Sequence, residues 1–81
     1  MPTLGRAGPY RISMFMSDCV EPRHVHVEGD DGAAKFWLEP VHLATSIGYS
    51  PRQISRIRTI IDRERGMLIQ GFDDVCERAQ R

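Results

Sequence analysis

The sequence lacks any long hydrophobic run. No stretch approaches the roughly 18 consecutive apolar residues that a membrane-spanning helix needs. Residues 1–9 also contain no apolar core of the kind found in a secretory signal peptide. We therefore expect no membrane association, and we expect the chain to be cytoplasmic.

Cysteine is scarce as well. The two cysteines, Cys19 and Cys76, lie far apart along the chain. Their spacing matches neither a metal-binding motif nor a disulfide framework. In the cytoplasm, both thiols are expected to be reduced.

The chain has no net charge, because eleven basic and eleven acidic residues cancel. It therefore has no overall electrostatic attraction to nucleic acid or to an anionic membrane. The charges are unevenly spread, however. Residues 18–39 hold six acids and only two basic residues, whereas residues 52–65 hold five arginines and only two acids. An acidic and a basic pole suit a homodimer or a charged partner.

The length of 81 residues suits one domain, so residues 1–81 are interpreted as a single unit. A chain of this size buries only about 60% of the surface that its unfolded form exposes. Its hydrophobic core is therefore small, and binding to a partner would help to stabilise it.

Alternating apolar and polar residues predict a three-stranded antiparallel β-meander in the first half of the chain. The predicted strands are residues 10–16, 23–28 and 33–39. Gly-Asp-Asp-Gly at residues 29–32 predicts a tight hairpin, because these residues tolerate a positive φ. Pro40 ends the third strand, since proline cannot donate to a strand ladder. Residues 41–48 fit either a short fourth strand or a single helical turn.

The hairpin also predicts which side chains share a face of the sheet. Even-numbered positions of the second strand lie opposite odd-numbered positions of the third, whichever loop length is assumed. One face then carries His24, His26, Lys35, Trp37 and Glu39. The other face is apolar and is the predicted core, with Val25, Val27, Ala34, Phe36 and Leu38.

The second half of the chain has a helical pattern. Ser50 and Gln53 form a capping box, and proline follows Ser50 at the first helical position. Apolar residues then recur every three, four or seven positions, which makes one helical stripe. The stripe comprises Ile54, Ile57, Ile61, Leu68, Phe72, Val75 and Ala79. Because Gly66 interrupts the pattern, we predict two helices, or one bent helix, packed on the sheet. The predicted fold class is therefore α+β.

Several blocks of the sequence resemble a known family. They are Glu-Pro-Arg-His-Val-His-Val at residues 21–27, Ala-Lys-Phe-Trp-Leu-Glu-Pro-Val at residues 34–41 and Gly-Tyr-Ser at residues 48–50. These blocks resemble the small bacterial proteins grouped as domain-of-unknown-function family four-one-six-zero. Arg23 replaces a proline of the family pattern, and the C-terminal helix matches less well. The resemblance implies a small protein encoded beside a second one, sometimes in a toxin–antitoxin-like gene pair.

His24 and His26 are the sharpest chemical feature of the sequence. Two histidines at positions i and i+2 of a strand project the same way and can bind one divalent transition metal. Glu39 is the expected third ligand, and His42 is a looser alternative. A bound metal would generate hydroxide for hydrolysis. The competing interpretation is a polar sheet face in which the histidines hydrogen-bond locally and Trp37 packs over them.

Three arginines, Arg52, Arg56 and Arg63, form a basic stripe on the first predicted helix. Phosphate contacts would make this stripe a nucleic-acid surface. Aromatic residues are not interleaved with it, however, and a solvated helix face explains it more simply. We therefore do not expect binding to nucleic acid.

Three functions remain open after these observations. The leading hypothesis is a non-enzymatic protein-interaction module, one half of a pair encoded together. Its expected surface is His24, His26, Trp37 and Glu39, since tryptophan is enriched at binding hot spots. The first alternative is a metal-dependent hydrolase or nuclease using His24, His26 and Glu39. The second is a nucleic-acid-binding regulator that uses the basic stripe.

Overall fold

A computed structural model gives the fold of the chain, and it describes residues 2–79. The elements follow one another as β1 (Thr3–Ala7), β2 (Tyr10–Ser13), the 3-10 helix η1 (Met16–Val20), β3 (His24–Gly29), β4 (Gly32–Leu38), β5 (Val41–Ile47), α1 (Pro51–Arg63) and α2 (Arg65–Ala79). The predicted α+β class is confirmed. The predicted number of strands, three or four, is wrong, because the sheet has five.

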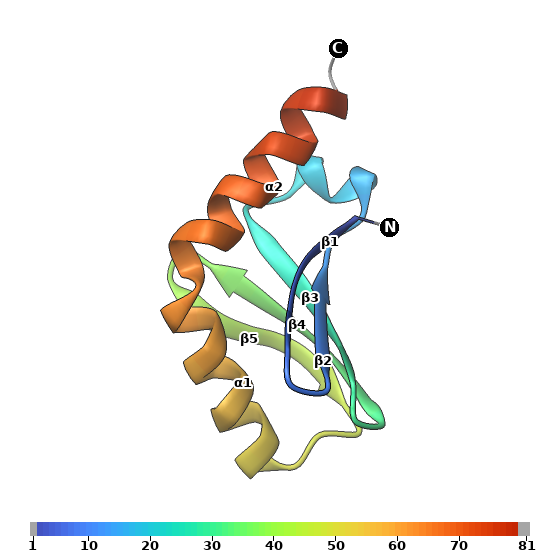
Figure 1. Ribbon diagram of the computed structural model, residues 1–81, viewed down its shortest axis with the longest axis vertical. Helices are drawn as coiled ribbons and strands as arrows, with labels where there is room; N and C mark the ends of the chain where they lie inside the picture. Colours follow the sequence, from blue (N-terminus) through green and yellow to red (C-terminus); the bar gives the residue numbers. More distant parts are fainter. Residues whose placement is uncertain (1, 80–81) are drawn as a thin grey trace.

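The additional strand is β1, at the N-terminal end of the chain (Figure 1). Its sequence, Thr-Leu-Gly-Arg-Ala, has no alternation of apolar and polar residues, so periodicity does not detect it. It forms because a turn at Gly8, whose φ is 57°, folds it back onto β2. Residues 41–47, which fitted a strand or a helical turn, form β5.

All five strands are antiparallel to their neighbours and lie in chain order across the sheet. The predicted hairpin between β3 and β4 is confirmed, with His26 opposite Lys35 and Val25 opposite Phe36. Its two turn residues, Asp30 and Asp31, have φ values of 54° and 65°. A positive φ at both positions is what a two-residue hairpin turn requires.

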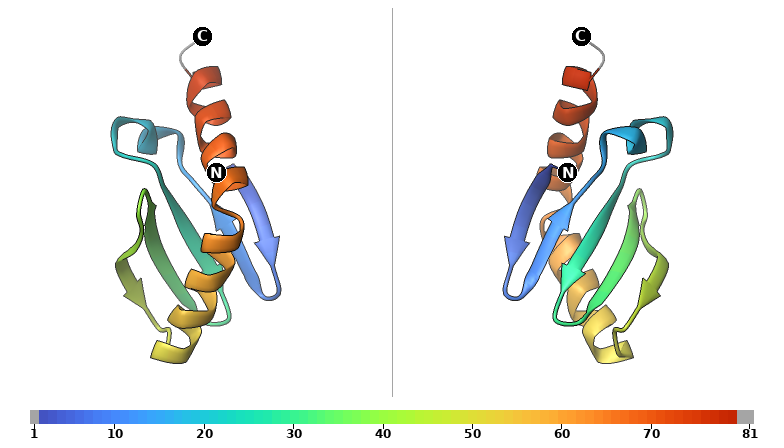
Figure 2. Two further views of the ribbon diagram at one scale, coloured as in Figure 1. Left: turned by 90° about the vertical axis from the view of Figure 1, so that its left-hand side faces the viewer. Right: turned by 90° about the vertical axis from the view of Figure 1, so that its right-hand side faces the viewer.

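Both α-helices pack on one face of the sheet (Figure 2). This face carries the predicted core, in which buried strand residues lie under Ile57, Ile61 and Leu68. Phe72 is also buried, but it lies outside the main apolar cluster, with its ring 5.7 Å from that of His24. The prediction of two helices is confirmed, although the break falls at Glu64 and not at Gly66.

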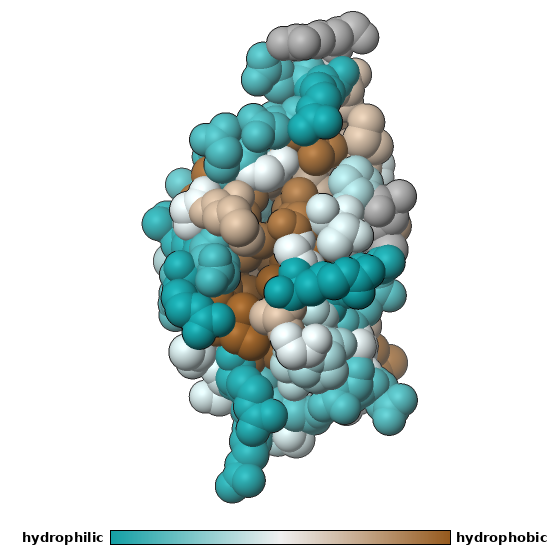
Figure 3. Space-filling view, viewed as in Figure 1, coloured by the Kyte–Doolittle hydropathy of each residue, from teal (hydrophilic) through white to brown (hydrophobic). Residues whose placement is uncertain are grey.

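The capping box at the start of α1 is present as predicted. The Gln53 backbone N–H donates to Ser50 Oγ over 3.2 Å, and the Ser50 N–H donates to Gln53 Oε1 over 2.8 Å. Hydrophobic surface is visible between the helices and β1 (Figure 3), where a groove is lined by Leu4, Ile60 and Met67 among others. No helix within residues 2–79 is both long and apolar enough to cross a membrane.

The two cysteines form a disulfide, so the prediction of two reduced thiols is wrong for this structure. Cys19 of η1 and Cys76 of α2 are 57 positions apart in sequence, and their Cα atoms lie 5.6 Å apart. Spacing motifs could not reveal this bond. It forms because the C-terminal part of α2 extends past the sheet and lies beside η1 (Figure 1).

Within the described residues, no α-helix lies over the sheet face opposite the helices (Figure 2). We call it the open face. Strand pairing puts on it Arg11 and Ser13 of β2, His24, His26 and Glu28 of β3, Ala33, Lys35 and Trp37 of β4, and His42, Thr45 and Ile47 of β5. A change of register between Lys35 and Phe36 leaves Ala44 without a partner, and this bulge keeps both His42 and Thr45 on the open face.

Candidate functional site

The candidate site lies at the end of the open face where β3 begins. The sequence predicted that His24, His26 and Glu39 would meet there. The structure brings together Asp18, His24 and His26. One ligand atom from each lies within 4.8 Å of the others. We call these residues the Asp-His-His cluster.

Asp18 reaches the histidines because η1 folds over the start of β3. The Phe15 backbone N–H donates to Asp18 Oδ2 over 2.8 Å, which anchors the carboxylate at the beginning of η1. Asp18 Oδ2 is then 2.9 Å from His26 Nε2 and 3.3 Å from His24 Nε2. Burial alone would raise the pKa of the Asp18 carboxyl. The Phe15 hydrogen bond and the interactions with the two neighbouring imidazoles outweigh burial and hold that pKa below its ordinary value.

His24 is completely buried. Its ring packs at centroid distances of 5.4 Å from Trp37, 5.7 Å from Phe72 and 5.2 Å from His26. Its Nδ1 is 2.8 Å from the carbonyl oxygen of Pro22. Because a carbonyl oxygen only accepts, Nδ1 carries the hydrogen. The other nitrogen, Nε2, has no hydrogen-bond partner among the described residues.

His26 is the accessible member of the cluster, with 25% of its side chain exposed. The Phe15 ring lies edge-on to it, 5.0 Å away between centroids. His26 Nε2 is within hydrogen-bonding distance of Asp18 Oδ2 and, because an ionised carboxylate only accepts, donates to it. His26 therefore connects the buried part of the cluster with the surface of the sheet.

Glu39, the expected third ligand, does not lie with the histidines. It follows the last residue of β4, so strand alternation no longer controls its direction. Its carboxylate is 2.8 Å from Arg23 and 3.8 Å from Arg65. Arg23 also forms two hydrogen bonds with Asp73 of α2, of 2.7 and 2.9 Å. The hydrogen bonds that Arg23 donates to these anions raise the pKa of Arg23, those to Asp73 first and the one to Glu39 next.

His42, the looser alternative ligand, is exposed and also lies outside the cluster. It lines a pocket of about 450 Å³ together with Trp37, Glu39 and three further residues. The ammonium group of Lys35 lies 4.5 Å from the centre of the Trp37 ring. Four residues were predicted to form the functional surface. His26 and Trp37 are partly exposed on the open face, His24 is buried, and Glu39 is exposed beside Arg23.

Asp18 is the cluster residue that sequence reasoning missed. It lies six positions before His24, in a segment interpreted as a polar turn, and no motif joins the two. Its position in the turn that leads into the His-Val-His strand was the available signal. That signal does not say how far the turn folds back over the strand.

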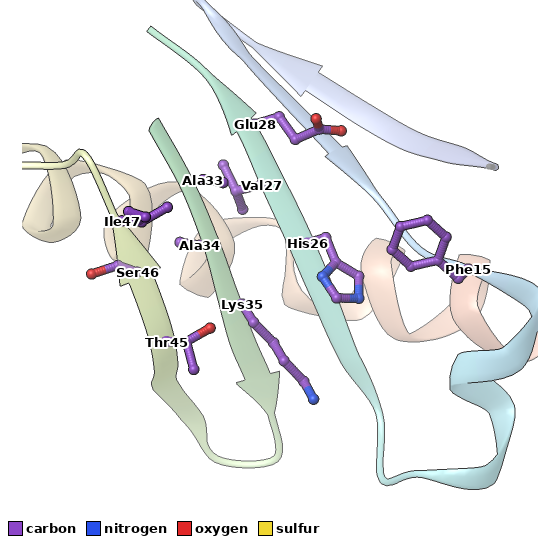
Figure 4. Close-up of a pocket in the computed structure, with 10 residues that line it drawn as sticks. All are labelled: Phe15, His26, Val27, Glu28, Ala33, Ala34, Lys35, Thr45, Ser46 and Ile47. Atoms are coloured by element: carbon purple, nitrogen blue, oxygen red, sulfur yellow. The ribbon is translucent and has the colours of Figure 1, made fainter. Parts of the chain in front are cut away.

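A shallow groove runs along the open face beside the cluster (Figure 4). It has a volume of about 370 Å³. Its lining comprises Phe15, His26, Val27, Glu28, Ala33, Ala34, Lys35, Thr45, Ser46 and Ile47. Phe15 and His26 lie on one side of it and Ile47 on the other (Figure 4). Phe15 is 44% exposed and Ile47 is 75% exposed, so the groove has apolar side chains at two of its margins.

The basic stripe lies on α1, toward the opposite end of the molecule from η1 (Figure 1). Arg52, Arg56 and Arg63 are all exposed. Arg63 is 3.3 Å from Glu64, whereas neither Arg52 nor Arg56 has an ion-pair partner within residues 2–79. The stripe and the Asp-His-His cluster are therefore separate features.

Comparison with known proteins gives one result. The model of a family described as Domain of unknown function (DUF4160) matches residues 10–73. The matched segment contains the whole Asp-His-His cluster, the open-face groove and α1. Neither the curated proteins nor the solved structures give a match to the chain.

Proposed function

The chain belongs to the family described as Domain of unknown function (DUF4160), and we propose its function from the features of its surface. The chain is a non-enzymatic protein-interaction module. It binds a small partner protein along the open face of its sheet. The observation that carries the proposal is the groove of about 370 Å³ on a sheet face that no α-helix covers.

The charges of the open face support a protein partner more than a nucleic acid. Arg11 is paired with Glu28 over 2.8 Å, and Lys35 is paired with Glu21 over the same distance. These pairs neutralise the basic groups beside the groove. An anionic polymer gains little from such a surface, whereas an apolar protein side chain can fill the space beside Ile47.

The edge of the sheet supports the same partner. β5 is an outer strand of the sheet, so one side of its backbone has no strand partner in the described part of the chain. Residues of β5 also form one wall of the groove. A partner segment in extended conformation can pair with β5 and place alternate side chains in the groove. We propose this mode of binding for a small protein encoded beside the chain, as in a toxin–antitoxin-like pair.

The test is co-expression with the product of the neighbouring gene, followed by calorimetric titration of the purified proteins. We expect Ile47→Asp to weaken binding by at least about 10-fold, because it places a charge at the apolar margin of the groove. Met67→Asp is the matched control. Met67 is 51% exposed and lies in the groove beside β1, away from the open face.

Two results would overturn the proposal. One is a neighbouring protein that does not bind, or that binds the Ile47→Asp variant as well as the parent. The other is a parent chain that is a dimer by light scattering and becomes monomeric with Ile47→Asp. That result would make a second copy of the chain the occupant of the open face.

We also propose that the chain acts in the cytoplasm, as its composition suggests. Cytosolic thiols are usually kept reduced, and disulfides are typical of oxidising compartments. In the proposed location, the bond between Cys19 and Cys76 would therefore be open for part of the protein's life.

A further inference from the structure

We propose that the Asp-His-His cluster is a binding site for one divalent transition-metal ion, such as zinc. The ligands are Nε2 of His24, Nε2 of His26 and Oδ2 of Asp18. This site goes beyond the docking function and does not depend on it. It also differs from the ligand set expected from the sequence, since Asp18 takes the place of Glu39.

The strongest argument is the state of His24. Its Nδ1 donates to the Pro22 carbonyl, so in the neutral ring Nε2 has a free lone pair and no hydrogen. This nitrogen is fully buried, has no hydrogen-bond partner within residues 2–79, and lies 3.3 Å from Asp18 Oδ2. A lone pair and a carboxylate oxygen repel each other at that distance unless a cation lies between them. Leaving a polar atom unpaired in the interior is also costly.

The hydrogen bond to Pro22 also orients the His24 ring for metal binding. Metal-binding histidines usually donate their other ring nitrogen to a carbonyl or a carboxylate, which fixes the tautomer and the ring orientation. Pro22 and the aromatic neighbours Trp37 and Phe72 fix the His24 ring in this way. The lone pair of Nε2 is therefore already directed toward Asp18.

Two of the three separations between ligand atoms fit a metal site after a small adjustment, and the third, between the two histidine nitrogens, is within 4.8 Å. Bonds of about 2.0–2.2 Å at tetrahedral angles separate ligand atoms by about 3.3–3.6 Å. His24 Nε2 and Asp18 Oδ2 are already 3.3 Å apart. His26 Nε2 is 2.9 Å from the same oxygen, as its hydrogen bond requires, and would move outward by about 0.4 Å when the metal takes the place of its proton, which leaves to solvent.

The ligand types indicate the class of metal. Two imidazoles and one carboxylate suit zinc and other late first-row ions better than calcium or magnesium, which prefer oxygen. Three protein ligands leave at least one position for water. His26 also lines the open-face groove (Figure 4), so the site is accessible to an ion from that side.

The test uses the intact, disulfide-bonded chain after removal of metals with a chelator. Calorimetric titration with zinc chloride should give one ion per chain. Asp18→Asn and His26→Ala each remove one ligand and should weaken binding by about 100-fold or more. The chain offers a matched control in His42→Ala, which removes the third histidine and should leave zinc binding unchanged. Cobalt(II) should report the same site by visible absorption.

Three outcomes would overturn the proposal. Zinc could fail to bind, it could bind the His26→Ala variant as tightly as the parent, or its binding could depend on His42. Nitrogen NMR of the imidazoles identifies the structural alternative directly. If His24 carries a proton on both ring nitrogens and zinc does not displace it, the proton is the cation between His24 and Asp18.

Discussion

At the scale of single residues, burial separates the two histidines of β3. His24 has no exposed surface, whereas 25% of the His26 side chain is exposed. His24 contacts the rings of Trp37 and Phe72 and donates to the Pro22 carbonyl. His26 contacts Asp18 and the Phe15 ring at the surface. Removing the two side chains should therefore have unequal effects on the fold.

We expect His24→Ala to lower the free energy of unfolding by about 2–4 kcal/mol, through a cavity and a carbonyl left without its donor. His26→Ala should lower it by no more than about 1 kcal/mol. Urea unfolding of the metal-free proteins measures both changes. Equal losses for the two variants would contradict the burial that distinguishes the two side chains.

At the scale of elements, η1 is held in place from two sides. The Cys19–Cys76 disulfide ties it to α2, and the Phe15–Asp18 hydrogen bond closes its first turn. Arg23, just after η1, adds two hydrogen bonds to Asp73 of α2. Because η1 carries Asp18, these contacts also position the third member of the Asp-His-His cluster.

Removing the disulfide should destabilise the whole domain. Replacing both Cys19 and Cys76 with serine opens a link across 57 positions. Chain-entropy arguments give a loss of roughly 4 kcal/mol for a loop of that length. Urea unfolding with and without dithiothreitol measures it. The reductant should lower the stability of the parent and leave the double-serine variant unaffected. A parent that does not respond to the reductant would contradict the role of the bond.

At the scale of the whole molecule, basic and acidic residues are balanced. Arg52 and Arg56 lie exposed on α1 without ion-pair partners in the described part of the chain. The chain as a whole has no net charge. The field of two arginines is screened within about 8 Å at physiological salt. We therefore predict that the basic stripe does not bind duplex DNA by itself.

We expect no binding of a fluorescent DNA duplex at micromolar concentrations of the protein and physiological salt, measured by anisotropy. The variant carrying Arg52→Ala and Arg56→Ala should behave like the parent. Tight binding that falls steeply with added salt and disappears in this variant would show that the stripe is a nucleic-acid surface.

The sequence by itself determined the features that repeat along one element. The period of two in β3 and β4 identified the core and open faces, including the pairing of His26 with Lys35. The helical period identified the buried side of α1, and the Ser50 capping box identified where it begins. These features are predictable because a side chain's direction within its own element follows from backbone geometry alone.

Only the tertiary structure decided which distant segments meet. The sequence of β1 has no periodic pattern, and this segment forms a strand because it pairs with the free edge of β2. Three contacts depend on how loops and the end of α2 fold over the sheet. They are the approach of Asp18 to His24, the Cys19–Cys76 bond and the ion pair between Arg23 and Glu39. Loops have no repeating direction, and their positions result from the packing of the entire chain. For this reason the carboxylate beside the two histidines is that of Asp18 and not that of Glu39, whereas the face that carries the two histidines is the one the sequence predicted.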